Sequence, residues 1–361
     1  MKVLVTGGAG FIGWHIVSAL VAAGHDVRVL DALLPHAHAS ERPPEFPDGV
    51  EFTRGDVRDR SVVIAALRGV DVVSHQAAMV GRGNEIRDVV PYVTGNDLGT
   101  AQLLAAMTDA GQGHLVLASS VVIYGDSRYD CPEHGRVRPP RRGKEALDAG
   151  RFEVTCPVCG SVVRDSPVEE DDPLDPPRNV YAVTKLAQEY LAGAWARETG
   201  GRAVALRYHN VYGPDMPYQS LYSGVAAAFR TAVERGTAPL VFEDGKPMRD
   251  FVHVRDVASA NVAALAWSGT GFRAFNVASG QPHSIADVAR ALSTARGGPP
   301  PVITGDYRIG DVRHIVASPR RLMDELGWRP SVSFAEGMAE FAYAPMRGGR
   351  VSAAPSPGAG G

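Results

Sequence analysis

Two side chains one helical turn apart suggest acid–base chemistry. Tyr181 and Lys185 lie in the segment YAVTK, and a spacing of four residues places both side chains on one face of a helix. A tyrosine with a pKa of about 10 is a poor base at neutral pH, but a nearby cation stabilises the phenolate and lowers that pKa. The same spacing is common on ordinary amphipathic helices. The hydroxyl pair Ser119-Ser120, which ends an apolar run, is the partner that gives it chemical meaning.

A glycine-rich turn near Met1 indicates a dinucleotide site. Gly7, Gly10 and Gly13 follow a short apolar run at three-residue spacing, where a strand would turn into a helix. Glycine lets the backbone turn tightly and approach a pyrophosphate, which the N–H groups of a helix N-terminus can bind. Asp31 ends the next strand, where a carboxylate holds ribose hydroxyls and repels a 2′-phosphate. The pattern favours NAD over NADP, with plain packing of the glycines as the alternative.

All three cysteines lie within one 29-residue window. Two short knuckles, Cys131-Pro-Glu-His134 and Cys156-Pro-Val-Cys159, have the spacing of a four-ligand structural zinc site. Such a site would fix a polar, Pro- and Arg-rich loop that cannot form its own core. A disulfide or redox pair between Cys156 and Cys159, and unpaired thiols, remain alternatives, and a neighbouring carboxylate could replace His134.

Composition limits the class of protein. The chain has 361 residues, of which 21% are charged, and a formal net charge of −3, so it can form two lobes and has no basic excess for nucleic acid. It contains no apolar run of 18 residues and no leader-like segment, so we expect a cytoplasmic protein that binds neither nucleic acid nor membrane. Residues 347–361 are rich in Gly, Pro and Ser and are expected to form a disordered tail.

Alternating strands and helices predict the scaffold that positions these residues. Strands are expected at Lys2–Thr6, Asp26–Leu30, Glu51–Thr53, Asp71–Ser74, His114–Ala118 and Ala203–Arg207, with helices at Phe11–Ala23, Ser61–Arg68, Tyr92–Ala110 and Tyr181–Glu198. This order is typical of an α/β fold with a Rossmann-like doubly wound parallel sheet, which binds ligands where loops follow strands.

The predicted organisation has two lobes and an insertion. We expect an NAD-binding domain over residues 1–210 and a smaller C-terminal α/β substrate lobe over residues 211–346. Helices are expected in the second lobe at Ser223–Arg235 and Ile285–Leu292, and Asp256–Trp267 is expected to return to the first lobe. Residues 126–178 form an insertion with a Cys-rich, zinc ribbon-like part at 131–159.

The chain resembles the extended short-chain dehydrogenases/reductases of the NAD-dependent nucleotide-sugar epimerase/dehydratase family. The motifs that carry the resemblance are TGGAGFIG, Asp31, Gly55-Asp56-Val57, HQAA, Asn96 with Gly99-Thr100, SSVVIYGD, YAVTK, RYHNVYGP, RDFVHVRDV and RIGDVRH. They span nearly the whole chain. The resemblance implies a tightly bound NAD, a nucleotide-sugar substrate, and a homodimer joined by the helices around Tyr92–Ala110 and Tyr181–Glu198.

The resemblance also implies residue roles. Tyr181 is the expected catalytic base, Lys185 the group that holds the nicotinamide ribose and lowers the Tyr181 pKa, and Ser120 the partner of the reacting sugar hydroxyl. The expected cofactor contacts are Gly7, Gly10, Phe11, Ile12, Gly13, Asp31, Asp56, Val57, Gln76, Ala77, Ala78, Asn96, Tyr181, Lys185 and His209. The expected substrate contacts are Met79, Ser120, Val121, Asn210, Arg249 and Arg308. Guanidinium groups suit a pyrophosphate, with ion pairs to Asp250 or Asp311 as the alternative.

The residues beside Ser120 favour one reaction. Dehydratases and decarboxylases of the family carry an acid where this chain has Val121 and Val122, and apolar side chains cannot serve as acid or base. We therefore expect transient oxidation at C4 of the sugar and non-stereospecific re-reduction, which is 4-epimerisation.

A looser resemblance of the insertion to dTDP-L-rhamnose 4-epimerase-type sequences implies a dTDP-6-deoxyhexose, such as dTDP-L-rhamnose, as substrate. UDP-glucose or UDP-glucuronate is the alternative substrate. A one-way nucleotide-sugar reductase or dehydrogenase and a non-catalytic NAD-binding sensor are the alternative functions.

Overall fold

A parallel sheet of seven strands forms the centre of the computed structural model, which describes residues 1–35, 37–38, 40–81, 86–218 and 224–348. The strands are β1 (Lys2–Thr6), β2 (Asp26–Asp31), β3 (Glu51–Arg54), β4 (Val72–His75), β5 (His114–Ser120), β9 (Arg202–Tyr208) and β13 (Gly271–Val277). Their order is β13-β9-β5-β4-β1-β2-β3, and every pair is parallel. The chain winds outward in both directions from β1 and β4, which confirms the predicted doubly wound fold.

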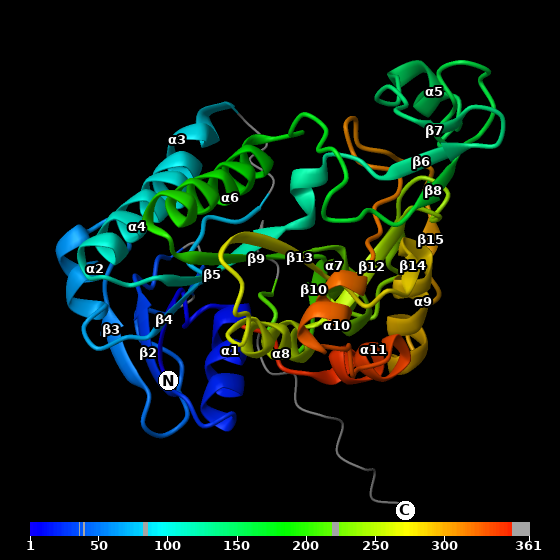
Figure 1. Cartoon of the computed structure of the whole chain (residues 1–361). Coiled ribbons are helices and arrows are strands. Elements are labelled where there is room, and N and C mark those ends of the chain that lie inside the picture. Colours follow the sequence, from blue (N-terminus) through cyan, green and yellow to red (C-terminus); the bar gives the residue numbers. More distant parts are fainter. Residues whose placement is uncertain (36, 39, 82–85, 219–223, 349–361) are drawn as a thin grey trace, which may run out of the picture.

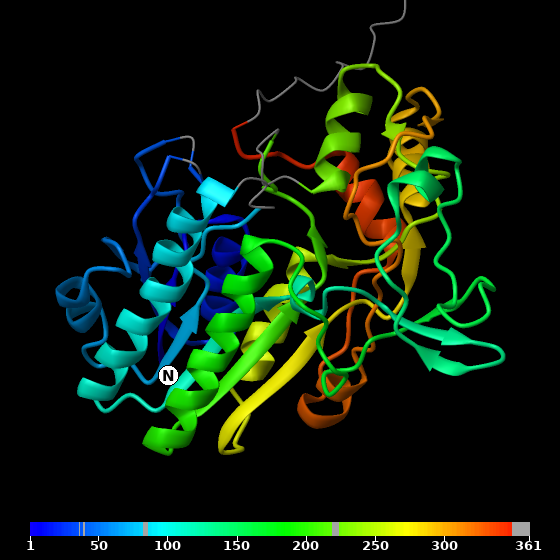
Figure 2. The same ribbon diagram turned by 90° about the horizontal axis from the view of Figure 1, so that it is seen from above.

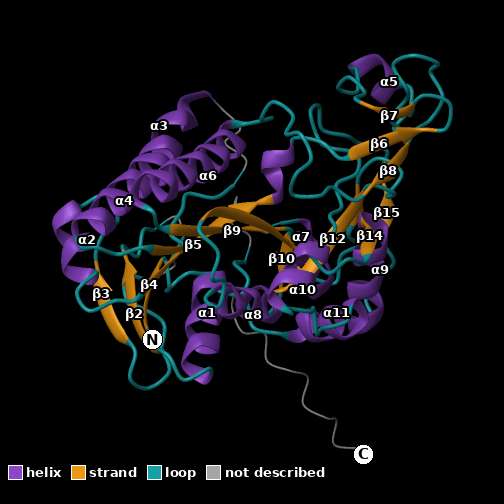
Figure 3. Ribbon diagram, viewed as in Figure 1, coloured by secondary structure: helices purple, strands orange, loops and turns teal. Residues whose placement is uncertain are grey.

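Helices cover both faces of this sheet (Figures 1 and 3). One face carries α1 (Phe11–Ala22) and α8 (Val254–Ala264), and the other carries α2 (Arg60–Ala66), α4 (Gly99–Asp109) and α6 (Val180–Thr199). Successive strand residues point to opposite faces, so Val3 and Val5 pack in the first core while Leu4 packs in the second. Burial on both sides explains why the strands are almost continuously apolar.

The predicted helix at Tyr92–Ala110 is divided in the structure. A short 3₁₀ turn (Ile86–Asp88) and α3 (Val89–Tyr92) come first, then a π-helical segment (Val93–Leu98), and only then α4. The helix α4 lies beside α6, as both ribbon views show (Figures 1 and 2).

The second lobe is built from small sheets and three packed helices. One sheet joins β10 (Asn210–Tyr212), β12 (Met248–His253) and β14 (Pro282–Ser284), and another joins β11 (Leu240–Val241) to β15 (Val302–Ile303). The helices α7 (Val225–Glu234), α9 (Ile285–Arg296) and α11 (Phe334–Tyr343) share one apolar cluster. Arg249 lies in strand β12, and α10 (Arg320–Leu326) packs beside β13 of the central sheet.

The chain passes between the lobes more often than a boundary at residue 210 implies. Consecutive elements lie in different lobes at the steps from β9 to β10, from β12 to α8 and from β13 to β14. The return of α8 was expected. The seventh strand, β13, corrects the predicted division, because it pairs with β9 in the central sheet.

The insertion forms a small unit at one end of the molecule (Figure 1). Its strands β6 (Arg128–Cys131), β7 (Gly135–Val137) and β8 (Arg164–Ser166) make an antiparallel sheet in the order β7-β6-β8, and α5 (Lys144–Asp148) lies beyond it. Its apolar cluster contains only five buried residues, Tyr129, Cys131, Val154, Cys156 and Val163.

The predicted tail is structured where it begins. Arg347 pairs with Pro217 in an isolated bridge, and its carbonyl oxygen accepts a hydrogen bond of 2.8 Å from the Tyr218 N–H, so the expectation of disorder from residue 347 was wrong there. Residues 349–361 lie outside the described residues. Among the described helices, none has the length and apolar character needed to cross a bilayer.

Candidate active site

A cleft of about 2360 Å³ lies at the carboxyl ends of the central strands, between the sheet and the second lobe. Of the predicted cofactor and substrate contacts, all except Asn96 line it: Gly7, Gly10, Phe11, Ile12, Gly13, Asp31, Asp56, Val57, Gln76, Ala77, Ala78, Met79, Ser120, Val121, Tyr181, Lys185, His209, Asn210, Arg249 and Arg308. The fold therefore gathers predicted contacts up to 301 positions apart, Gly7 and Arg308, in one cavity.

The glycine turn has the space that a pyrophosphate needs. Gly7 adopts a φ of +69°, and a Cβ there would lie 2.6 Å from the Ala77 nitrogen. A Cβ on Gly10, by contrast, would meet only the Gly7 oxygen, at 3.3 Å. Gly10 caps α1 without a side-chain hydrogen bond, so the first N–H groups of this helix face a cleft that an anion can enter. This cradle fits the diphosphate of a dinucleotide.

Asp31 is fixed beside this turn by backbone donors. Its Oδ2 accepts a hydrogen bond of 3.0 Å from the Ala9 N–H, and its Oδ1 accepts one of 2.9 Å from the Leu33 N–H. The carboxylate is 8% exposed at the end of β2 and lines the cleft. Its position fits the predicted contact with the adenosine ribose.

Asn96 does not line the cleft but binds the backbone of Met79, which does. Its side-chain oxygen accepts a hydrogen bond of 2.6 Å from the Met79 N–H, and its amide donates to the Met79 carbonyl (3.0 Å) and to Thr184 Oγ1 (2.9 Å). Since Asn96 is fully buried and does not line the cleft, its predicted direct contact with the cofactor is replaced by an indirect one. It fixes the loop that carries Ala77, Ala78 and Met79.

The three predicted catalytic residues line the same cleft. Ser120 ends β5, Tyr181 lies in the first turn of α6, and both residues line the cleft. Burial raises the pKa of Tyr181 to about 12, and the influence of the Ser120 side chain opposes this shift. The predicted lowering of the Tyr181 pKa is therefore not realised in the isolated chain, because burial outweighs the stabilisation of the phenolate.

Lys185 lies one turn further along α6, where it is 3% exposed. Its Nζ donates a hydrogen bond of 2.8 Å to the Ala118 carbonyl. Burial lowers the pKa of Lys185 to about 8, although the carboxylates of Glu189 and Asp97 act in the opposite direction. An ammonium that is poised close to neutral pH fits a role in binding and charge stabilisation.

A buried network of hydrogen bonds and an ion pair next to Ser120 was not predicted from the sequence. Ser119 Oγ donates to Glu189 Oε1 (2.5 Å), and Arg207 forms an ion pair of 2.8 Å with the same carboxylate. Arg207 also donates to the Tyr124 hydroxyl (2.9 Å). The spacing of Lys185 and Glu189, again one helical turn, was the available signal for this network.

Unpaired polar atoms in the cleft indicate a ligand. Both ring nitrogens of His209 and the Oδ1 of Asn210 are buried without a hydrogen-bond partner in the described structure. Burial also lowers the pKa of His209 to about 3, so its ring is neutral at physiological pH. Because buried polar atoms normally have partners, these groups are suited to bind cofactor or substrate.

The two predicted phosphate-binding arginines approach the cleft differently. Arg308 lies over the Phe242 ring, 5.1 Å from its centroid. Arg249 donates to the carbonyl oxygens of Val312 (2.6 Å) and Arg313 (2.9 Å). The suggested pair between Arg249 and Asp250 is not formed, since Asp250 accepts hydrogen bonds from the N–H groups of Ser279 and Gly280.

Other lining residues were not predicted. Phe242, Glu243 and Arg347 face the cleft. These residues contact distant parts of the chain, and none of them belongs to a local motif that would have predicted its place in the cleft.

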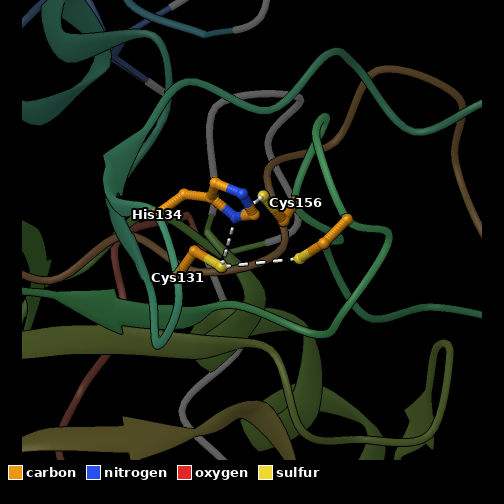
Figure 4. Close-up of side chains that lie close together, drawn as sticks. Cys131, His134 and Cys156 are labelled. Atoms are coloured by element: carbon orange, nitrogen blue, oxygen red, sulfur yellow. Dashed lines mark hydrogen bonds between the residues drawn. The ribbon is translucent and has the colours of Figure 1, made fainter.

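The four predicted metal ligands come together in the insertion. Their ligand atoms all lie within 4.8 Å of one another. Cys131 Sγ lies 3.6 Å from His134 Nδ1 and 3.7 Å from Cys159 Sγ, and Cys156 Sγ lies 3.8 Å from His134 Nδ1. Figure 4 shows Cys131, His134 and Cys156 directed toward one another.

These separations match a tetrahedral site. Two thiolates at about 2.3 Å from zinc lie about 3.8 Å apart at the corners of a tetrahedron. A disulfide needs an S–S distance of about 2.05 Å, and all three cysteines are free. The donor set and its geometry therefore fit zinc better than the alternative Cys156–Cys159 bridge.

Comparisons with known proteins agree with this site. A profile of the NAD dependent epimerase/dehydratase family matches residues 3–142 and 152–278, interrupted inside the insertion. A dTDP-L-rhamnose 4-epimerase of Burkholderia thailandensis is 36% identical over 94% of this chain and 93% of its own length, and a UDP-glucose 4-epimerase of Lacticaseibacillus casei is 29% identical over 95% and 96%. The solved structure of a Thermus thermophilus UDP-glucose 4-epimerase complexed with NAD superposes with a TM-score of 0.73 at 34% identity, covering 95% of this chain and 98% of that one. The chain belongs to the NAD-dependent epimerase/dehydratase family.

Proposed function

We propose that this protein is a nucleotide-sugar 4-epimerase that uses tightly bound NAD and acts on a dTDP-6-deoxyhexose such as dTDP-L-rhamnose. The observation that carries the proposal is that Ser120 and Tyr181 line the same cleft beside two apolar residues, Val121 and Val122. A proton acceptor is present there, and the acid or base that an elimination requires is not supplied at those two positions.

The chain's own residues would hold and move one proton. Ser120 orients the C4 hydroxyl of the sugar, and Tyr181 takes its proton and later returns it. When bound, NAD supplies the hydride acceptor for C4 and a positive charge that favours the Tyr181 phenolate. Lys185 would bind the nicotinamide ribose, a role supported by its place on α6 one helical turn from Tyr181.

The shape of the cleft supports re-reduction on either face of the sugar. Its volume of about 2360 Å³ exceeds what a dinucleotide alone requires, and its wall near Ser120 includes the apolar side chains of Val121 and Val122. Apolar walls leave a keto sugar free to turn between the two hydride transfers.

The proposed sugar and base rest on similarity. The relative with 36% identity acts on dTDP-L-rhamnose according to its name, whereas the UDP-glucose 4-epimerase from Lacticaseibacillus casei is 29% identical. UDP-glucose is therefore the second candidate, and UDP-glucuronate, expected from sequence, belongs in the same test.

A panel of nucleotide sugars tests the proposal. The purified protein is incubated with dTDP-L-rhamnose, UDP-glucose, UDP-glucuronate and GDP- and CDP-sugars, and the epimers are separated. We expect conversion of dTDP-L-rhamnose at C4, with Tyr181→Phe as the inactive control. Exclusive conversion of a UDP-sugar would replace the proposed substrate. Solvent deuterium at C3 or C5 of the product would contradict the reaction itself.

The state of the cofactor separates the alternative enzyme classes. An epimerase regenerates its NAD in each cycle, so we expect NAD to remain bound through purification. Strict dependence on added NADPH would indicate a one-way reductase. Bound NAD without turnover of any sugar would indicate a sensor.

We also propose that Cys131, His134, Cys156 and Cys159 bind one structural zinc ion. The ligand separations and the five-residue apolar cluster of the insertion support this. Metal analysis should find one zinc per chain, lost in Cys156→Ser. Three titratable thiols in a protein without metal would contradict it.

A further inference from the structure

The insertion contacts the part of the second lobe that holds both predicted phosphate-binding arginines. Residues 306–314 carry Arg308 and supply the carbonyl groups that bind Arg249, and we call them the arginine loop. We infer that metal binding by the insertion controls the affinity of the cleft for the nucleoside diphosphate of the substrate, because the insertion holds the arginine loop in place. This inference rests on the proposed zinc site and nucleotide-sugar substrate.

Four side chains of the insertion bind the arginine loop. Arg142 donates to the Asp311 carbonyl (2.9 Å), Arg178 donates to the Gly310 carbonyl (2.9 Å), Glu153 pairs with Arg313 and His314, and Asp148 accepts from the Tyr307 hydroxyl. The contacts reach both ends and the middle of the loop. The insertion therefore helps to hold the loop in place, together with second-lobe contacts such as the hydrogen bond of 2.7 Å from the Glu243 N–H to the Asp306 carbonyl.

Two of these side chains are tied to the metal cluster. Glu153 lies three residues before Cys156, and its neighbour Val154 packs against the buried cysteines in the small apolar cluster. Arg142 donates a hydrogen bond of 3.0 Å to the Phe152 carbonyl. An apolar cluster of five residues is too small to fold alone, so a bound metal would order residues 152–156 and with them both contacts.

Glu243 connects the insertion to the wall of the cleft. This buried residue adopts a φ of +53°, a conformation that is rare for a side chain other than glycine. Its carboxylate accepts two hydrogen bonds from Arg142 (2.8 and 2.9 Å) and one from Arg313 (2.7 Å). The surroundings thus hold Glu243 firmly although its backbone is strained.

The charge of Glu243 explains why this contact affects an anionic ligand. Glu243 lines the same cleft as Arg249 and Arg308 and interacts electrostatically with Arg249. Arg142 neutralises this carboxylate, and its withdrawal would leave a less compensated negative charge beside the predicted diphosphate position. Disorder of the insertion would therefore weaken diphosphate binding through charge as well as through loop position.

The NAD half of the cleft is built from other elements. The glycine turn and Asp31 belong to the first lobe and are fixed by the central sheet. Metal removal should therefore change the affinity for the nucleotide sugar and leave that for NAD unchanged.

Calorimetric titration with dTDP and UDP tests the inference, with the zinc content measured before and after treatment with a chelator. We expect metal removal to weaken binding of the preferred diphosphate about tenfold in the unmodified protein. The dissociation constant for NAD, measured in the same samples, should change less than about twofold, since RT ln 2 is only about 0.4 kcal/mol.

Variants of the insertion residues that contact the arginine loop test whether these contacts carry the effect of the metal. Arg142→Met should keep its zinc and bind the diphosphate weakly. Removing zinc from this variant should weaken diphosphate binding little further, because the substitution and the metal removal act through the same contact. Glu153→Gln, at a half-exposed position, is the milder variant if Arg142→Met folds poorly. Arg136→Gln is the matched control, since the ion pair of Arg136 with Asp172 lies within the insertion.

Three results would overturn the inference in distinguishable ways. The coupling between the metal and the cleft is refuted if metal removal leaves the diphosphate affinity unchanged. It is also refuted if metal removal reduces this affinity as much in Arg142→Met as in the unmodified protein. Neither result bears on the zinc site or on the substrate class. A protein that never binds zinc refutes the metal site. A zinc-loaded protein that binds neither dTDP nor UDP refutes the proposed substrate class.

Discussion

Alanine at two glycines of the same turn should have different effects: Gly7→Ala should lower stability, and Gly10→Ala should weaken cofactor binding. In Gly7→Ala, a left-handed conformation costs about 1 to 2 kcal/mol for a residue with a Cβ. The new Cβ would lie 2.6 Å from the Ala77 nitrogen, and such overpacking costs about 1 to 3 kcal/mol more. With an unfolding entropy of about 2.1 cal/mol/K per residue, the sum lowers the Tm of this chain by about 3 to 7 °C.

Gly10→Ala should fold normally and bind NAD poorly. Gly10 has a φ of −72°, which alanine adopts easily, and its Cβ would meet only the Gly7 oxygen at 3.3 Å. The methyl group would project where the diphosphate must approach the first turn of α1. Loss of one hydrogen bond to a charged group costs about 1.5 to 3 kcal/mol, which corresponds to about a 10- to 150-fold weaker affinity.

The assay combines thermal unfolding of NAD-free protein with fluorescence titration of NAD. Gly7→Ala should lower the Tm, whereas Gly10→Ala should lower the affinity at an unchanged Tm. An unchanged NAD affinity in Gly10→Ala would refute the assignment of the pyrophosphate to this turn.

Three further predictions concern catalysis and assembly. Tyr181→Phe should reduce kcat about 10²- to 10⁴-fold without loss of bound NAD, as single-turnover assays can show, and near-normal turnover would exclude Tyr181 as the base. Because the pKa of Lys185 is lowered to about 8, its ammonium is lost as pH rises through that value, and kcat/KM should fall above about pH 8. In Glu189→Gln the fall should begin at lower pH, since the Glu189 carboxylate raises the pKa of Lys185. The surface predicted to join two copies includes Leu98 and Tyr190, which lie around α4 and α6 and are 43% and 66% exposed. Leu98→Glu should therefore yield monomers, measured by light scattering, and an unchanged mass would place the interface elsewhere.

Local patterns predicted much of the fold. The short apolar strands, the glycine turn and the helical spacing of Tyr181 and Lys185 are encoded within short segments, and the structure places them in one parallel sheet and one cleft. The two cysteine knuckles are also local, and their ligand atoms converge. Zinc itself and the residue roles stay predictions.

Contacts between distant segments were not predictable in the same way. Strand β13 takes its place in the central sheet by pairing with β9, a contact between segments that are distant in the sequence. Glu243 and Arg142 are 101 residues apart, and neither belongs to a motif. Arg347 lies in a Gly- and Pro-rich segment whose composition suggests disorder, yet its backbone pairs with residues near Pro217.

The repeated passage of the chain between the lobes limits how the enzyme can open. Steps from β9 to β10, β12 to α8 and β13 to β14 tie the lobes together at the floor of the cleft, which opposes a wide hinge motion. Exchange of sugars should then depend on surface loops, while the floor stays closed. A reaction that oxidises its substrate and must reduce the same molecule again benefits from such a frame, since an escaped keto sugar would leave the cofactor reduced and the enzyme inactive.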